Sequence, residues 1–157
     1  SLEQAILLNP SFAQGHFALG FLLLFCGQPE EAIACLERAT ELSPRDPHLS
    51  SFHAWRALAH LMLGETEVAV SLAQMGARVP NAQYWPQVLL TVALGLLGRR
   101  EEAARALEGL LERQPGSTLA TLRDDFFFCR DAETVELVLR GLRLAGMAEG
   151  APRTQAA

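Results

Sequence analysis

The residues with the clearest potential for chemistry are His53, Arg56 and His60. Their i, i+3, i+7 spacing places them on one stripe of a helix, within a stretch that is otherwise mostly apolar. A guanidinium between two imidazoles suits a carboxylate or a phosphate, because Arg56 can donate paired hydrogen bonds to such a group. The stripe therefore predicts an anion or acidic-peptide contact. A solvated stripe that only orients the helix is the alternative interpretation.

The other reactive side chains do not combine into a catalytic or metal centre. The four histidines lack HExxH or paired Cys/His spacing. The cysteines at positions 26, 35 and 129 form neither an even disulfide set nor a CxxC pair, which favours a reducing, cytoplasmic location. Adjacent carboxylates in one helix point apart, whereas acid–base catalysis needs carboxylates that converge. We therefore expect a non-enzymatic chain without cofactor or metal.

Composition and charge exclude several classes of partner. The chain has 157 residues, of which 50% are hydrophobic and 20% charged, as expected for one compact unit or a short array of small ones. All 13 basic residues are scattered arginines and the net charge is -5, so a nucleic-acid groove is not expected. The longest apolar runs are about ten residues, and a membrane span needs about twenty.

The elements that carry these side chains follow an internal repeat. Leu8-Asn9-Pro10 recurs as Leu42-Ser43-Pro44 after 34 residues. A second signal is a glycine followed five residues later by an alanine, and it starts at Gly27, Gly64 and Gly98. Prolines close the units at positions 10, 44, 80 and 115. Two separate signals at nearly constant spacing indicate a repeat protein.

Each unit is predicted to form two antiparallel helices. Gly27 suits the left-handed backbone that ends a helix, and Pro29 suits the first turn of the next helix, where its missing N–H is not needed. Ala32, Leu36 and Ala39 supply small or apolar contacts at helical spacing. No segment alternates with a period of two over a useful length, so an all-α fold is expected.

These residues resemble the tetratricopeptide repeat (TPR) family, whose units of about 34 residues carry small side chains where two helices touch. The best unit, 13–46, matches the family at Leu19, Gly20, Ala32, Leu36, Ala39 and Pro44, with His16 in place of the usual Trp and Leu23 in place of the usual Tyr. The resemblance implies a right-handed helical-hairpin solenoid, an α–α superhelix in which each repeat buries its apolar face on the next.

The resemblance divides the chain into one TPR-like domain, residues 1–147, and a flexible tail, residues 148–157. Within the domain we expect a half repeat at 2–10, repeats at 11–46, 47–80 and 81–115, and C-terminal cap helices at 116–147. Because the chain begins inside a repeat and without Met, we expect it to be a piece of a longer protein.

A narrower resemblance is to the C-terminal TPR segment of bacterial class III adenylate/guanylate cyclases, and related segments follow winged-helix regulators. It rests on residues 8–49 and 126–149, where Phe-Cys-Arg-Asp-Ala-Glu leads into Leu-Arg-Gly-Leu-Arg-Leu-Ala-Gly-Met. The chain contains none of the cyclase catalytic residues. The resemblance implies a bacterial signalling protein in which this module serves an N-terminal domain.

The first helix of each unit carries the concave surface that the TPR resemblance implies for binding. These helices are apolar on nearly every face, which predicts a patch that packing within the repeat leaves exposed, and such patches mark interaction sites. The candidate protein-binding residues are Phe17, Phe21, Leu24, Phe25, Leu58, Leu61, Met62, Trp85, Val88 and Val92. His53, Arg56 and His60 would add the anion contact on the same inner surface. Alternatively, the repeats curl and bury this patch themselves.

The expected function is therefore that of a protein-interaction and regulatory module. The partner would be a protein or peptide, and a homodimer is the specific version because symmetric self-contacts cover an apolar face most simply. A monomeric structural spacer and the TPR module of a winged-helix regulator are the alternatives. Binding of an acidic chaperone-type tail is not expected, because the chain has no lysine and the corresponding positions hold no basic clamp.

Overall fold

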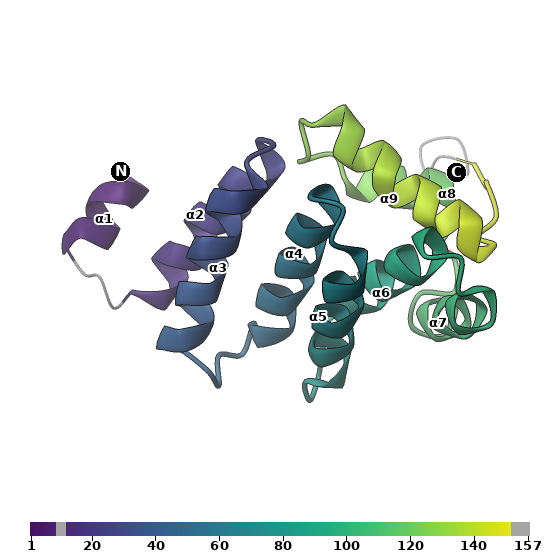
Figure 1. Cartoon of the computed structure of the whole chain (residues 1–157), viewed down its shortest axis with the longest axis horizontal. Helices are drawn as coiled ribbons and strands as arrows, with labels where there is room; N and C mark the ends of the chain where they lie inside the picture. Colours follow the sequence, from purple (N-terminus) through teal and green to yellow (C-terminus); the bar gives the residue numbers. More distant parts are fainter. Residues whose placement is uncertain (9–11, 152–157) are drawn as a thin grey trace.

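The computed structural model describes residues 1–8 and 12–151, and within them it contains nine helices and no strand (Figure 1). The helices are α1 (Leu2–Leu8), α2 (Ala13–Phe25), α3 (Pro29–Leu42), α4 (Leu49–Met62), α5 (Thr66–Arg78), α6 (Trp85–Leu96), α7 (Arg100–Arg113), α8 (Leu119–Asp125) and α9 (Ala132–Ala145). Three antiparallel hairpins, α2/α3, α4/α5 and α6/α7, stand side by side in chain order. The all-α helical solenoid predicted from the sequence is confirmed.

The three hairpin turns share one glycine geometry. Gly27, Gly64 and Gly98 have φ values of 82°, 78° and 72°, a left-handed region that a residue with a Cβ rarely adopts. After each glycine, the next backbone N–H bonds back to a carbonyl five residues earlier, as in the bond from Gln28 to Leu23 of 2.9 Å. The recurring glycines therefore set where each first helix ends and its partner begins.

Small residues set how closely the helices of this stack approach. Gly20 of α2 faces α3 so closely that a Cβ there would lie 2.8 Å from Cγ of Leu36. Ala32, Leu36 and Ala39 on α3 are fully buried. Gly76 of α5 lies against Pro86 of α6 in the same way, where a Cβ would be 3.0 Å from the ring. Each hairpin thus covers the apolar face of its neighbour, as the repeat pattern predicted.

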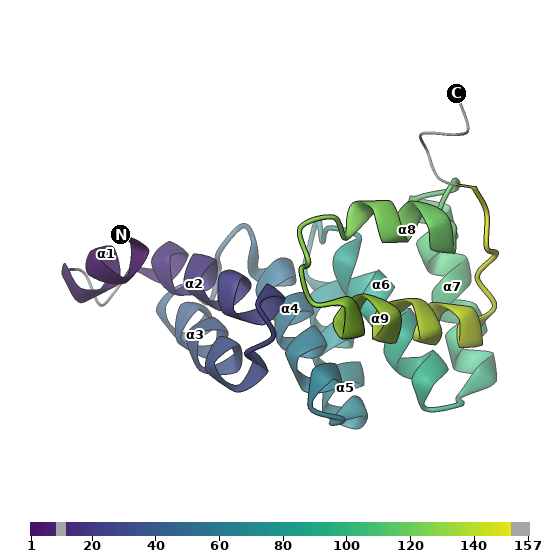
Figure 2. The ribbon, with the colours of Figure 1, turned by 90° about the horizontal axis from the view of Figure 1, so that it is seen from above.

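The last two helices do not continue the stack. Helix α9 packs mainly along α6, the first helix of the third hairpin, and makes a smaller contact with α7. Figure 2 shows α8 and α9 lying antiparallel beside each other, with α9 crossing α6. The sequence predicted these helices as a cap on the last repeat. Apart from α8, the helices that α9 packs against are the two helices of the last hairpin.

Segments near both ends of the described chain contact the neighbouring helices. Helix α1 lies in the predicted half repeat and packs against α2, and residues 9 and 10 of that half repeat lie outside the described residues. At the other end, Leu119 and Ala120 of α8 donate backbone hydrogen bonds to Ala148 and Glu149, at 2.9 and 3.0 Å. The first residues of the predicted flexible tail are therefore hydrogen-bonded to α8, and residues 152–157 lie outside the described part.

Candidate functional site

An aromatic cluster occupies the side of the stack lined by α2, α4 and α6. Trp55 of α4 lies at its centre, with ring centroids 5.3 Å from Phe25 of α2 and 5.3 Å from Trp85 of α6. Phe128, from the loop between α8 and α9, inserts into this cluster and lies 4.8 Å from Phe25 and 5.6 Å from Phe21. The chain therefore places one of its own side chains where the sequence analysis placed a partner.

Most of the predicted binding residues are buried, and Phe128 touches three of them, Phe21, Phe25 and Trp85. Six of the ten are no more than 5% exposed: Leu24, Phe25, Leu58, Leu61, Val88 and Val92. The other four, Phe17, Phe21, Met62 and Trp85, are half-buried against the core. Phe128 is the residue that sequence reasoning missed. The run of three phenylalanines at 126–128 indicated packing, but nothing in it identified the surface that Phe128 covers.

The polar stripe on α4 does not form a convergent site. Arg56 pairs with Glu37 of α3 at 3.4 Å, and Nδ1 of His60 lies 3.2 Å from Glu65 at the start of the α5 turn. The stripe was predicted to face the inner surface. The structure turns Arg56 toward α3 instead, beside a shallow cavity of about 220 Å³ that it shares with Glu37, Thr40 and Glu41.

His53 is the most unusual member of this stripe. The residue is 5% exposed, and neither its Nδ1 atom nor Nε of Arg56 has a hydrogen-bond partner among the described residues. Burial, and then the nearby positive charge of Arg56, lowers the pKa of His53 from its ordinary value. Burial in the hairpin stack therefore disfavours the protonated form of His53.

The cysteines form no disulfide in the described part of the chain. Cys26 is exposed, while Cys35 and Cys129 are partly buried. Burial raises the pKa of the Cys35 thiol, and the carboxylate of Glu31 raises it further. Burial is also the main cause of the raised pKa of Cys129. A raised pKa lowers the fraction of thiolate, which is the reactive form of a cysteine. Among residues 1–8 and 12–151 no three His, Cys, Asp or Glu side chains are grouped to hold a metal ion.

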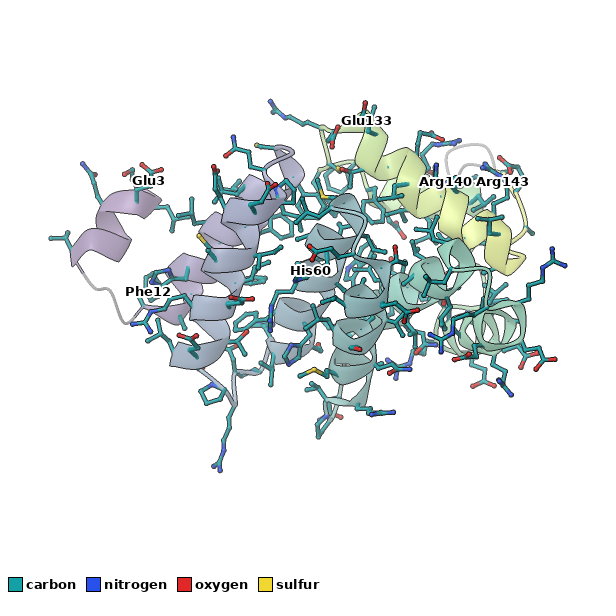
Figure 3. The ribbon with its side chains drawn as sticks, in the orientation of Figure 1. Glu3, Phe12, His60, Glu133, Arg140 and Arg143 are labelled. Atoms are coloured by element: carbon teal, nitrogen blue, oxygen red, sulfur yellow. The ribbon has the colours of Figure 1, made fainter. Side chains whose placement is uncertain are left out.

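An open cleft of about 780 Å³ lies between α9 and the tips of the first two hairpins. Its apolar part comes from Leu61 and Met62 at the end of α4 and from Leu137 of α9. The α9 wall carries the charged residues Glu133, Glu136, Arg140 and Arg143, and the α2–α3 turn closes one end with Gly27 and Pro29. Figure 3 shows Glu133, Arg140 and Arg143 following one another along α9, far from Glu3 and Phe12 at the other end of the molecule.

Stacked antiparallel hairpins with an open, mixed-polarity cleft define a helical-repeat scaffold. Comparisons with known proteins indicate which kind of helical repeat this chain resembles. Sequence profiles of the tetratricopeptide repeat match residues 13–46 and 84–108. The first match coincides with the best unit of the sequence analysis, and the second lies within its third repeat. These matches support the TPR family for this chain and, with it, a protein-interaction module of the TPR type.

Two individual proteins are similar to this chain. The mouse (Mus musculus) interferon-induced protein with tetratricopeptide repeats 3 is 26% identical over 127 residues, which are 79% of this chain and 32% of that protein. The chain thus spans about a third of the length of this curated relative. The crystal structure of MamA matches the fold with a TM-score of 0.67 at 16% identity, covering 92% of this chain and 82% of MamA.

The helices also bear on the question of a membrane. Among the described residues, none of the helices combines the length and the apolar character needed to cross a bilayer.

Proposed function

We propose that this chain is a non-enzymatic protein-interaction module whose partner binds in the cleft between α9 and the tips of the first two hairpins. The observation that carries the proposal is the contrast between two surfaces. Phe128 already occupies the aromatic side of the stack, whereas the cleft of about 780 Å³ remains open among the described residues. An open cleft lined by apolar side chains and a few charged groups is a candidate binding site.

The lining of the cleft indicates the chemistry of that segment. Leu61, Met62 and Leu137 offer an apolar strip that would pack against apolar side chains of a partner. Acidic residues lie toward the start of α9, and Arg140 and Arg143 lie toward its end. A partner helix with an apolar stripe, basic residues near one end and acidic residues near the other would match this arrangement.

The specific version of this proposal places the module after the N-terminal domain of a bacterial cytoplasmic signalling protein. This version rests on the likeness of residues 8–49 and 126–149 to the C-terminal segment of class III cyclases. A winged-helix regulator in place of the cyclase and a monomeric spacer remain the alternatives. Homodimerisation through the concave side would first require Phe128 to leave the aromatic cluster, whereas binding in the cleft would not.

A matched pair of methionine variants tests the position of the site. Peptides of about 16 residues, selected from a phage-displayed library against the whole chain, are titrated by fluorescence anisotropy. Met62 lines the cleft, while Met75 is 50% exposed on α5 and lies outside it. We expect Met62→Glu to weaken binding about tenfold or more, because an apolar contact of a buried side chain contributes roughly 1.5 kcal/mol. Met75→Glu should leave the affinity unchanged.

A second variant guards against misfolding of Met62→Glu, since Met62 packs partly against the core. Arg140→Ala changes an exposed side chain of the cleft wall and should also weaken binding of peptides that carry carboxylates. The proposal is wrong if the selected peptides bind both cleft variants as tightly as the wild type. It is equally wrong if no peptide binds with a dissociation constant below about 100 μM.

A further inference from the structure

The exposed face of α9 that forms one wall of the cleft carries an ordered set of charges. Glu133 and Glu136 lie in its first half, Arg140 and Arg143 in its second half, and all four are exposed. Helix geometry of 100° per residue places all four on the side opposite Val138, which is fully buried. The same four side chains line the open cleft. The charged wall of the cleft is thus one continuous, solvent-facing stripe.

The charges of this stripe are complementary to those of a second α9 that runs in the opposite direction. Glu136 and Arg140 lie two residues before and after Val138, and Glu133 and Arg143 lie five residues before and after it. In a second α9 that runs antiparallel across the first, each glutamate therefore lies at the same level along the helix axis as an arginine of the other helix. A parallel pair would instead bring like charges together. Antiparallel contact about a twofold axis is the geometry of an isologous dimer.

We propose that the occupant of the cleft is α9 of a second copy of this chain, in an antiparallel α9–α9 pair. The inference rests on the proposed function, because it names the partner of the same cleft. Its polar contacts are two copies each of Glu136 with Arg140 and of Glu133 with Arg143. The pair thus supplies the basic and acidic ends that the cleft requires of its partner.

Apolar contacts at the ends of the helix add to the charge pairs. Leu144 is 58% exposed on its own chain, near the end of α9. In the antiparallel pair, the end of the partner helix reaches the start of α9, where Gly27 and Pro29 of the α2–α3 turn close the cleft. The second Leu144 therefore approaches Pro29, and Leu137 lies near the middle of the pair. Burial of Leu144 gives the contact an apolar component that charge alone would not supply.

The ion pairs already present on this face do not prevent its charged side chains from contacting a second copy. Glu136 lies 3.6 Å from Arg123, and Arg143 lies 3.9 Å from Glu149, with exposed fractions between 49% and 68%. Exposed pairs of this kind contribute little to stability and exchange partners readily. Arg140 forms no ion pair with another side chain among the described residues. The four charges are therefore available to a second copy.

The size of the contact sets the expected affinity. A helix of 14 residues is about 21 Å long, so one helix pair with the cleft rim buries less surface than a standard interface of about 800 Å² on each partner. We expect a dissociation constant on the order of 10 to 100 μM at low salt. Because ion pairs contribute, the dissociation constant should rise with ionic strength.

Charge reversal with mixing tests this inference on the whole chain. Analytical ultracentrifugation from about 5 μM to 1 mM should show a monomer–dimer equilibrium for the wild type in the expected range. Arg140→Glu and Glu136→Arg should each be monomeric, because like charges face each other in their dimers. A one-to-one mixture of the two variants should dimerise again, because every pair then joins a glutamate to an arginine. Circular dichroism confirms that both variants fold.

Each alternative outcome is informative. Arg105→Glu reverses an exposed arginine on α7 and should dimerise like the wild type, so a monomeric Arg105→Glu would show that total charge is responsible. A wild type that stays monomeric at 1 mM overturns the inference, and so does a mixture that fails to dimerise. Peptides that still depend on Met62 would then leave the proposed cleft in place with a different occupant. A dimer that Arg140→Glu does not affect would place the self-contact on another face.

Discussion

Glycines lie at helix contacts both in the hairpin stack and where α9 meets α6, but the two contacts differ in how closely the neighbouring atoms approach. A Cβ added at Gly76 would lie 3.0 Å from the ring of Pro86 and 3.0 Å from a carbonyl oxygen. A Cβ added at Gly141 would lie 2.6 Å from both the Cγ1 and the carbonyl oxygen of Val92. A Cβ at Gly95 would overlap the carbonyl group of Gly141. The crossing of α6 and α9 is thus the tighter contact.

This difference shows how a repeat stack ends. An added Cβ at Gly20 or Gly76 of the hairpin stack would meet its nearest neighbour at 2.8 or 3.0 Å, which is less close than at the α6–α9 crossing. The α6–α9 crossing occurs once, and it needs glycine on both helices at the same point. That crossing also delivers Phe128 to the aromatic cluster, because the loop that carries Phe128 leads directly into α9. Closure of the aromatic side therefore depends on one local fit between two backbones.

Gly141→Ala is expected to have the largest effect, because it tests the close crossing of α6 and α9 directly. The new methyl group must push α9 away from Val92, so we expect the free energy of unfolding to fall by about 3 kcal/mol. The displaced helix should also expose apolar surface. Urea unfolding followed by circular dichroism measures the first effect, and binding of a hydrophobic dye measures the second.

Gly109→Ala is the matched control, on the neighbouring helix α7. A Cβ there would lie 3.0 Å from Nε2 of Gln87, the end of a flexible side chain. We expect a change within about 1 kcal/mol, of either sign, because alanine favours the helix while Gln87 must shift. Equal losses of unfolding free energy in Gly141→Ala and Gly109→Ala would show that the α6–α9 crossing is no more sensitive to an added methyl group than α7 is.

A second, smaller effect separates two adjacent phenylalanines of the loop between α8 and α9. Phe128→Ala removes the ring that touches Phe21, Phe25 and Trp85, so we expect a loss of about 2 kcal/mol, below the range for a fully buried ring. Phe127 is 85% exposed and lies 5.5 Å from the ring of Phe128. Phe127→Ala should therefore change stability by less than about 0.5 kcal/mol.

Urea unfolding of the two alanine variants, measured side by side, gives this difference directly. Tryptophan emission provides a second readout, because loss of Phe128 should open the surroundings of Trp85 to water and shift its emission to longer wavelength. Equal stabilities of the two variants would show that the loop does not close the aromatic side in solution. The concave surface would then be open, as one of the two interpretations of the sequence held.

The hairpins could be predicted from the sequence because local signals recur in them. Gly27, Gly64 and Gly98 each mark a turn that only a glycine adopts easily, and the alanine five residues later marks the helix that follows. These features depend on residues close together in the chain. Repetition then turned weak local signals into a confirmed all-helical solenoid.

The path of α9 could not be predicted in the same way. Gly95 and Gly141 are far apart in the sequence, and each is a single glycine in a helix, without a recurring partner. Helical spacing predicted one stripe of His53, Arg56 and His60, but it could not show that Glu37 of another helix pairs with Arg56. Likewise, Leu61 and Met62 were named as binding residues, while the α9 wall of their cleft was not. Contacts between distant segments decide these features.

The smallest expected effect concerns the hairpin stack. There His53 is buried, and its Nδ1 atom has no hydrogen-bond partner among the described residues. Its pKa is lowered in the folded chain, so the unfolded chain binds a proton first as the pH falls through the ordinary value of about 6.5. The contribution of His53 to stability should therefore be constant above that pH and decrease below it, until the pH reaches the lower folded pKa. Urea unfolding at pH 7.5 and 5.5 measures this decrease. His53→Gln should reduce it, and His48→Gln, at an exposed position, should retain it. An unchanged decrease in His53→Gln would mean that the stack tolerates a charge at this position as well as the exposed surface does.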